Sequence, residues 1–319
     1  MRKIMYGALI LVLIGVLGVI ITLNNSGVEA FTFSSVDVNE KQEVSAEGIT
    51  TIIIDSPSVD VNVIPTKKDQ VEVEFSGKVG KKSKALYKLD IDEDGDTVEI
   101  SMEKKNKFQF MMFNFTRVSL NIKVPEKMYD SIQINASSGD IVVEEMNSKE
   151  MVIITESGDI EIMKSVIKGS LNLEASSGDV KVKDTVGNVI DIETSSGDIT
   201  AIKNEAKEIE FLTSSGDIES NNQSSEKMNI NTSSGDITID AEEITGNISM
   251  EASSGDIDVS FVQIPEALAV DYKSSSGDGI ANIEGIKFSE KSDHRILGEI
   301  GVGGYQITAR TSSGDFEIR

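Results

Sequence analysis

Aspartate side chains recur at one place in each repeat of the second half of this chain, and they are the first candidates for chemistry. Each follows the glycine of a Ser-Ser-Gly-Asp tetrapeptide or a close variant of it. Carboxylates that follow glycines at regular spacing bind calcium between stacked coils in some repeat proteins. The aspartates concerned are Asp140, Asp159, Asp179, Asp198, Asp217, Asp236, Asp256 and Asp278.

A structural role competes with calcium at these aspartates. Each carboxylate could accept backbone N–H groups of its own turn, while the serine hydroxyls bond along the stack. Calcium-binding nonapeptide repeats have a shorter period and more glycines than this chain. We therefore predict a structural turn, no metal ligand set and no cofactor, and keep a calcium-stabilised repeat protein as an alternative.

A second acidic segment, residues 90–95, has the Asp-x-Asp-x-Asp-Gly spacing that opens an EF-type calcium loop. Position twelve of that loop would be Ser101 and not a bidentate glutamate. Apolar residues alternate on both sides of the segment, as they do in strands. An acidic hairpin turn is the preferred interpretation. The alternating residues are Tyr87, Leu89 and Ile91 before the turn and Val98, Ile100 and Met102 after it.

Residues for catalysis are few. His294 is the only histidine and lies in a polar stretch, and the chain has no cysteine, so a nucleophile–histidine pair would depend on His294 alone. We expect His294 at the surface. Carboxylates serve in carbohydrate-active enzymes, but the aspartates here are explained by the repeat. We predict no catalytic residues and no enzyme, with a carbohydrate-active enzyme as the remotest alternative.

The elements that position these aspartates repeat with a period of about 19 to 20 residues. The motif glycines are separated by 19 to 22 residues up to the eighth and by 37 before the ninth. Such a period predicts a solenoid, in which stacked coils bury a common core. The glycines are Gly139, Gly158, Gly178, Gly197, Gly216, Gly235, Gly255, Gly277 and Gly314.

Strand periodicity surrounds each glycine. Apolar residues stand seven and five positions before it and a small residue three before, as in Ile209, Phe211 and Thr213 ahead of Gly216. After it, apolar residues stand two and four positions on. The change of phase predicts a corner between two strands, with glycine permitting the bend through positive φ. Polar stretches such as residues 203–208 close the coil at its other end.

Both ends of the solenoid are expected to be atypical. Residues 52–63 follow the repeat pattern with Val59 in place of the glycine, and residues 297–300 resemble a worn copy inside the long final gap. Terminal repeats must cover the core. We predict degenerate repeats and a cap over residues 46–130, and the repeat solenoid over 131–319. About nine coils at a strand spacing of about 4.8 Å make a rod of about 40 Å.

The N-terminus predicts membrane attachment. Arg2 and Lys3 precede an uncharged stretch of 20 residues, 4–23, which is long enough to span a bilayer as a helix. We predict a transmembrane signal anchor over residues 1–23 and a linker over 24–45. The positive-inside rule places the N-terminus in the cytoplasm and the rest of this single-pass protein outside.

Composition limits the partners. The net charge is −24, which argues against binding of nucleic acid, and tryptophan is absent. Residues 108–115 gather four phenylalanines and two methionines between lysines and Arg117, so this segment either covers the end of the core or contacts a membrane or protein partner.

The repeats, taken with the N-terminal segment, resemble a family of bacterial proteins. Motifs such as Ile209–Ile218, which reads I-E-F-L-T-S-S-G-D-I, are similar to those of the "putative adhesin" family, which includes LiaG-like envelope proteins. The likeness covers residues 52–319 and implies a β-solenoid, but no catalytic residues. We predict an extracytoplasmic binding or scaffold module with envelope or membrane proteins as partners, a link to envelope stress, and no small-molecule substrate. A surface adhesin is the first alternative.

Overall fold

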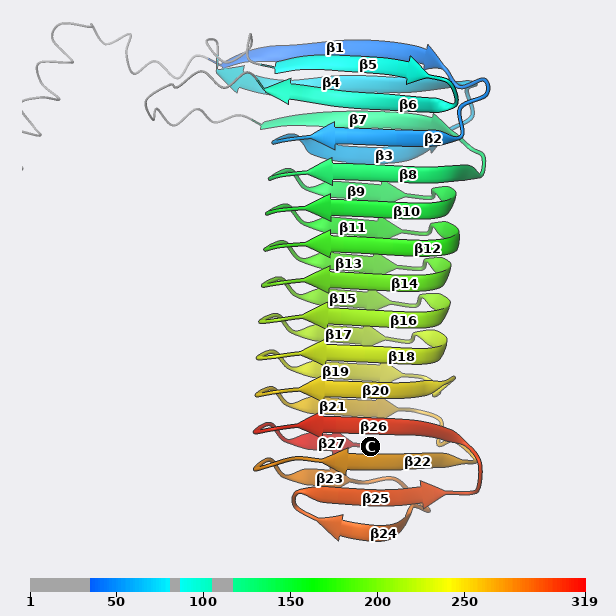
Figure 1. The fold of residues 1–319 in the computed structure, drawn as a ribbon, viewed down its shortest axis with the longest axis vertical. Helices are drawn as coiled ribbons and strands as arrows, with labels where there is room; N and C mark the ends of the chain where they lie inside the picture. Colours follow the sequence, from blue (N-terminus) through cyan, green and yellow to red (C-terminus); the bar gives the residue numbers. More distant parts are fainter. Residues whose placement is uncertain (1–34, 81–86, 105–116) are drawn as a thin grey trace, which may run out of the picture.

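Two long sheets face each other along a rod (Figure 1). The structure is a computed structural model that describes residues 35–80, 87–104 and 117–319, in which there are 27 strands and no helix. No helix in these residues could therefore cross a membrane. The predicted anchor, residues 1–23, and the aromatic segment, residues 108–115, lie outside the described residues. The all-β prediction is confirmed for the described chain.

The sheets are mainly parallel and become antiparallel only at the ends of the rod. In spatial order, the 13-stranded sheet contains β1 (Ser35–Ser45), β4 (Gln70–Gly80), β7 (Arg117–Pro125), β3 (Asp60–Thr66), β9 (Ile141–Glu144), β11 (Ile160–Met163), β13 (Val180–Lys183), β15 (Ile199–Ile202), β17 (Ile218–Asn221), β19 (Ile237–Ala241), β21 (Ile257–Phe261), β27 (Phe316–Ile318) and β23 (Gly279–Ala281). The 14-stranded sheet contains β24 (Lys287–Ser292), β25 (Arg295–Ile300), β22 (Leu268–Lys273), β26 (Tyr305–Thr311), β20 (Asn247–Ala252), β18 (Ser224–Thr232), β16 (Glu205–Thr213), β14 (Val186–Thr194), β12 (Val166–Ala175), β10 (Asn147–Thr155), β8 (Tyr129–Ala136), β2 (Thr51–Ser56), β6 (Thr97–Lys104) and β5 (Tyr87–Asp94).

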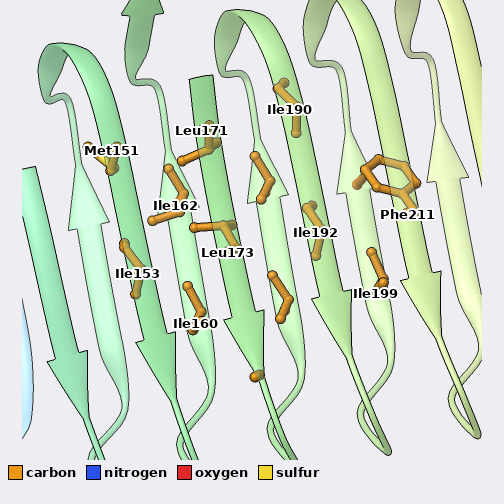
Figure 2. Packing of buried hydrophobic residues seen from close by; sticks show 14 of the residues in the cluster. Met151, Ile153, Ile160, Ile162, Leu171, Leu173, Ile190, Ile192, Ile199 and Phe211 are labelled. Carbon is orange, nitrogen blue, oxygen red and sulfur yellow. The ribbon is translucent and has the colours of Figure 1, made fainter. Parts of the chain in front are cut away.

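Each coil contributes one strand to each sheet, and the core lies between them. Ile153 of β10 pairs in parallel with Leu173 of β12, which pairs with Ile192 of β14. Ile160 and Ile162 of β11 face them from the other sheet (Figure 2). All five side chains are buried. The predicted change of phase at the glycine is confirmed, because it turns the apolar residues of both strands toward the same core.

The first coil is the one predicted with valine in place of glycine. β2 pairs with β8 and β3 pairs with β9, in register with the repeats that follow. On its other side, however, lies the later coil of β6 and β7. Strands β1 and β4 extend one sheet and β5 extends the other, all in antiparallel pairing. These three strands form an N-terminal cap, and β1 occupies much of the predicted linker because Val36, Val38 and Val44 pack toward the core.

The C-terminal end departs from a simple stack in sequence order. The last motif copy, with β26 and β27, lies between the coil of β20 and β21 and that of β22 and β23. The prediction that residues 297–300 form a worn repeat is wrong. They belong to β25, which runs antiparallel to β22 and forms a hairpin with β24. This hairpin covers the end of one sheet. The apolar alternation in this segment therefore belongs to a strand of the C-terminal cap and not to a repeat coil.

Candidate functional site

The Ser-Ser-Gly-Asp corners lie in a column along one edge of the rod. Each joins a strand of the 14-stranded sheet to the next strand of the other sheet, as β16 is joined to β17, and the column follows one side of the ribbon in Figure 1. The predicted corner between two strands of one coil is thus confirmed. The opposite connections, called here second corners, lie along the other edge.

Glycine is required in the corners by the neighbouring coil and not by its own backbone angle. None of the nine motif glycines has positive φ, so the predicted reason was wrong. A Cβ on Gly216 would lie 1.8 Å from the carbonyl oxygen of Gly197, and the equivalent distance for Gly255 is 1.7 Å. No side chain fits at this separation, because carbon and oxygen atoms in contact stand well over 3 Å apart.

The aspartates form a ladder that links coils. Except for the first, Asp60, the backbone N–H of each one donates to Oδ1 of the aspartate in the neighbouring coil, at 2.8 Å from Asp217 to Asp198 and from Asp236 to Asp217. The predicted bonds within each aspartate's own turn are therefore replaced by bonds along the stack. This aspartate ladder runs, in spatial order, through Asp60, Asp140, Asp159, Asp179, Asp198, Asp217, Asp236, Asp256, Asp315 and Asp278.

The small residue three positions before the glycine forms hydrogen bonds where it is threonine, a role that was not predicted from the sequence. Oγ1 of Thr213 accepts the N–H of Gly216 at 3.1 Å, and its hydroxyl donates to the carbonyl oxygen of Gly197 at 3.2 Å. Thr194 and Thr232 make the same pair of bonds in their coils. Threonine at this place satisfies a buried N–H and a buried carbonyl at once. The signal was the recurrence of threonine at this position, from Thr194 through Thr213 to Thr232.

No set of three or more histidine, cysteine, aspartate or glutamate side chains is arranged around a metal-sized centre in the part of the chain that the structure describes. In the aspartate ladder, one oxygen of each carboxylate up to Asp315 already accepts an N–H. Residues 90–94 lie in β5 and pair with β6, and Gly95, at φ 65°, and Asp96 form the turn of this antiparallel hairpin. The predicted acidic hairpin turn is confirmed.

His294 is exposed, as predicted, and lies at the end of the glycine column. Its Nδ1 is 2.8 Å from the carbonyl oxygen of Gly277, which also accepts hydrogen bonds from the hydroxyls of Tyr272 and Ser274. Burial is the main cause that raises the pKa of Tyr272. In earlier coils a threonine of the next coil bonds to this carbonyl, so His294 helps to cap the column.

The second corners, formed by the polar stretches predicted to close each coil, contain buried polar residues. Asn204 is buried, accepts the N–H of Thr185 at 3.0 Å and donates to the carbonyl of Val182 at 3.0 Å. The residue before it, Lys203, has φ 52°. The signal was a polar residue seven positions after four successive motif glycines, Gly158, Gly178, Gly197 and Gly216. The buried set is Ser165, Thr185, Asn204 and Gln223, and the residues of positive φ are Glu145, Lys164, Asp184, Lys203 and Asn222.

A charged cluster ties the C-terminal cap together. Asp271 of β22 binds Arg295 of β25 and lies 3.0 Å from Arg310 of β26. Burial disfavours the ionised carboxylate, but the hydrogen bonds from Arg295 and Arg310 outweigh it and lower the pKa of Asp271. The arginines also donate to backbone carbonyls of β22, Arg295 to Tyr272 and Arg310 to Asp271 itself. The cluster therefore joins three strands of the cap.

An open groove of about 720 Å³ interrupts the second corners near the C-terminal end. Three connections form it: residues 242–246 between β19 and β20, 262–267 between β21 and β22, and 301–304 between β25 and β26. Its lining is Glu243, Ile244, Thr245, Asn247, Gln263, Ile264, Pro265, Glu266, Ala267, Gly303, Gly304 and Tyr305. No motif in the sequence pointed to it, because it arises where the stack departs from sequence order.

The fold and these corners define the class as a β-solenoid whose recurrent Ser-Ser-Gly-Asp motif holds neighbouring coils together. Residues 49–319 match the family described as Toastrack DUF4097. The chain therefore belongs to the Toastrack DUF4097 family. This match does not assign the chain to a LiaG-like subgroup within the family.

Three solved structures share the fold at low sequence identity. A "putative adhesin" from Parabacteroides distasonis is 15% identical, with 88% of this chain and 97% of that chain covered and a TM-score of 0.52. A "putative lipid binding protein" from the same species is 16% identical, with 88% and 96% covered and a TM-score of 0.53. A "putative adhesin" from Parabacteroides merdae is 10% identical, with 88% and 96% covered and a TM-score of 0.51. No curated protein matches the sequence.

Proposed function

We propose that this protein is a non-enzymatic binding and scaffold module of the bacterial cell envelope, anchored in the membrane by residues 1–23. The single observation that carries the proposal is a continuous two-sheet stack with a cap at each end, which presents long side walls and an open groove. Such a rod holds binding surfaces at set positions.

The location is part of this proposal. The charge pattern before residues 4–23 favours a cytoplasmic N-terminus and an extracytoplasmic rod. A connection to envelope stress belongs to the same proposal and rests on the resemblance to LiaG-like proteins. Partners are then other envelope or membrane proteins, and neither nucleic acid nor a small-molecule substrate.

A surface adhesin is the second candidate, favoured by relatives of the same fold that are described as adhesins. A lipid ligand, suggested by the description of one relative, fits the groove less well, because Glu243 and Glu266 in its lining would repel an anionic head group.

Accessibility on cells separates these candidates. Full-length protein is expressed in a walled bacterium and probed with an antibody against the folded rod, before and after removal of the wall. We expect labelling only after wall removal. Labelling of intact cells would instead support the adhesin, and labelling only after membrane permeabilisation would contradict both.

A further inference from the structure

The three connections around the groove are packed against one another by backbone contacts. The N–H of Gln263 donates to the carbonyl of Glu242 at 2.8 Å, which joins the first connection to the second. A Cβ on Gly304 would lie 1.8 Å from the carbonyl oxygen of Ala267, so the third connection lies directly on the second. Asn247 accepts the N–H of Gln306 at 2.9 Å and holds the start of β26. The groove is therefore a built surface.

Apolar side chains are unusually exposed around this groove. Val302 is 95% exposed and Val262 is 81% exposed, while Ile264 and Tyr305 are 47% and 42% exposed. Val302 stands between Gly301 and Gly303, whose φ values of 63° and 74° form a turn that presents it outward. In the regular coils, the turns of the second corners carry charged or amide side chains instead. Exposed apolar clusters next to a concave surface mark interaction sites.

The charge of the groove has one sign. Glu243 and Glu266 belong to its lining, which contains no lysine or arginine. Glu242 is exposed immediately beside it. Carboxylates at the rim of an apolar surface favour a partner with cations at matching places and disfavour an acidic one.

Behind the groove lies a buried polar side chain with an unpaired oxygen atom. Gln223 is only 7% exposed, and its Oε1 has no hydrogen-bond partner. It lines a cavity of about 10 Å³ that shares Glu243, Ile244 and Thr245 with the groove. A cavity of this size is close to the smallest that holds one water. The packing thus leaves a small cavity where the first connection meets the groove.

We propose that the groove binds an extended segment of a partner protein that carries apolar side chains flanked by lysine or arginine. The apolar residues would cover Ile264, Val302 and Tyr305, and the cations would pair with Glu243 and Glu266. This inference rests on the proposed binding function and specifies its partner. Charge complementarity decides against a second copy of this acidic chain, whose net charge is −24.

The test is a titration of full-length protein, held in zwitterionic nanodiscs, with fluorescent ten-residue peptides at physiological salt. One peptide alternates leucine and lysine. A second replaces each leucine by serine, and a third replaces each lysine by glutamate. We expect the leucine–lysine peptide to bind at least about tenfold more tightly than either control, since it alone offers both the apolar cover and the charge.

Variants assign the binding to the groove. The pair Ile264→Ser and Val302→Ser should weaken binding of the leucine–lysine peptide about tenfold. The pair Glu243→Gln and Glu266→Gln should weaken it similarly and reduce its dependence on salt. Ile280→Ser and Glu284→Gln change an exposed apolar residue and an exposed acid that do not line the groove, and should leave the affinity unchanged.

Three outcomes would overturn the inference. Equal binding of the serine–lysine peptide would mean attraction by net charge alone, and equal weakening by Ile280→Ser would place the site elsewhere. Sedimentation that shows a dimer lost on Val302→Ser would assign the groove to a second copy. Failure of the peptide test would leave the envelope location to the labelling experiment above, so the two proposals fail separately.

Discussion

Within each corner, the glycine and the aspartate act mainly on the neighbouring coil. The glycine lets the carbonyl of the previous glycine approach, and the aspartate accepts an N–H from the next one. Ionised carboxylates about 5 Å apart repel by about 0.8 kcal/mol in water. A bond from an N–H to each carboxylate offsets this repulsion, because charge-assisted hydrogen bonds are among the stronger ones.

Gly216→Ala tests the close approach. Because its Cβ would lie 1.8 Å from a backbone oxygen, neighbouring coils must separate, and we expect a loss of about 3 kcal/mol in the free energy of unfolding. Chemical denaturation measures it. Ser215→Ala, at an exposed position of the same corner, should change the free energy by less than about 0.5 kcal/mol. Equal effects from the two variants would show that the contact between coils is unimportant.

Substitutions of Asp217 test whether the aspartate ladder depends on the carboxylate oxygen as a hydrogen-bond acceptor. Asp217→Ala leaves the N–H of Asp236 without its Oδ1 acceptor and should cost about 1–2 kcal/mol in the free energy of unfolding. Asp217→Asn keeps an oxygen at that position and removes one charge from the ladder, so it should cost less than about 0.5 kcal/mol. Denaturant titration compares the two. If asparagine proved as costly as alanine, the charge and not the acceptor would be the essential feature.

At the scale of elements, strands that depart from the repeat carry the ends of the rod. β1, β4 and β5 cover one end in antiparallel pairing, and the β24–β25 hairpin covers the other. Open sheet edges promote association with other chains. β24 is exposed along its length, with Lys287, Glu290 and Lys291 among its side chains and a bulge after Phe288, all features that oppose edge pairing.

Asp271→Asn tests the charged cluster that joins β22, β25 and β26. The pKa of Asp271 is lowered, so its ionised form stabilises the folded state above the ordinary value of 3.8, and this stabilisation is lost as pH falls through the lower folded pKa. We expect the substitution to cost on the order of 1 kcal/mol at pH 7. Hydrogen exchange at pH 7 should show faster opening of β24 and β25.

Asp258→Asn is the matched control, because the pKa of Asp258 is raised whereas that of Asp271 is lowered. Burial raises the pKa of Asp258 although Arg319 opposes the shift. Its ionised form therefore weakens the fold as pH rises from 3.8 through the folded pKa. The asparagine variant should be as stable as the parent at pH 7, or more stable. Destabilisation equal to that of Asp271→Asn would contradict the assignment of the cluster.

At the scale of the whole molecule, the coils stack in an order that differs from the sequence at both ends. Two coils exchange places near the N-terminus and two near the C-terminus. The second exchange carries the chain back through residues 301–304 and creates the groove. Stability of such a stack is roughly a sum over neighbouring coils.

The melting temperature of full-length protein should be the same in EDTA and in millimolar calcium. A site whose dissociation constant lies 100-fold below the calcium concentration would add about 2.7 kcal/mol. The ladder carboxylates already accept N–H groups, and no three-ligand cluster occurs in the described parts of the chain. Circular dichroism measures the transition. A clearly higher melting temperature in calcium than in EDTA would instead establish the calcium-stabilised alternative.

The sequence alone was sufficient for the strands and corners of the repeats and for the expectation that both ends are atypical, but not for the strands that form those ends. Alternation around Gly216, as in Ile209 and Phe211 before it and Ile218 after it, is a local property that each coil repeats. The hairpin at Gly95 was equally readable, since both strands and the turn lie within adjacent residues.

Only the tertiary structure decided which coil lies on which, and so where the groove forms. Every coil that carries the motif offers the same glycine and aspartate contacts, so Gly314 can stack on Gly255 as well as Gly277 could. Local pattern cannot choose between equivalent neighbours; the caps and connection lengths do. The role of Gly216 was hidden for the same reason, because its constraint comes from a carbonyl 19 residues away in the chain.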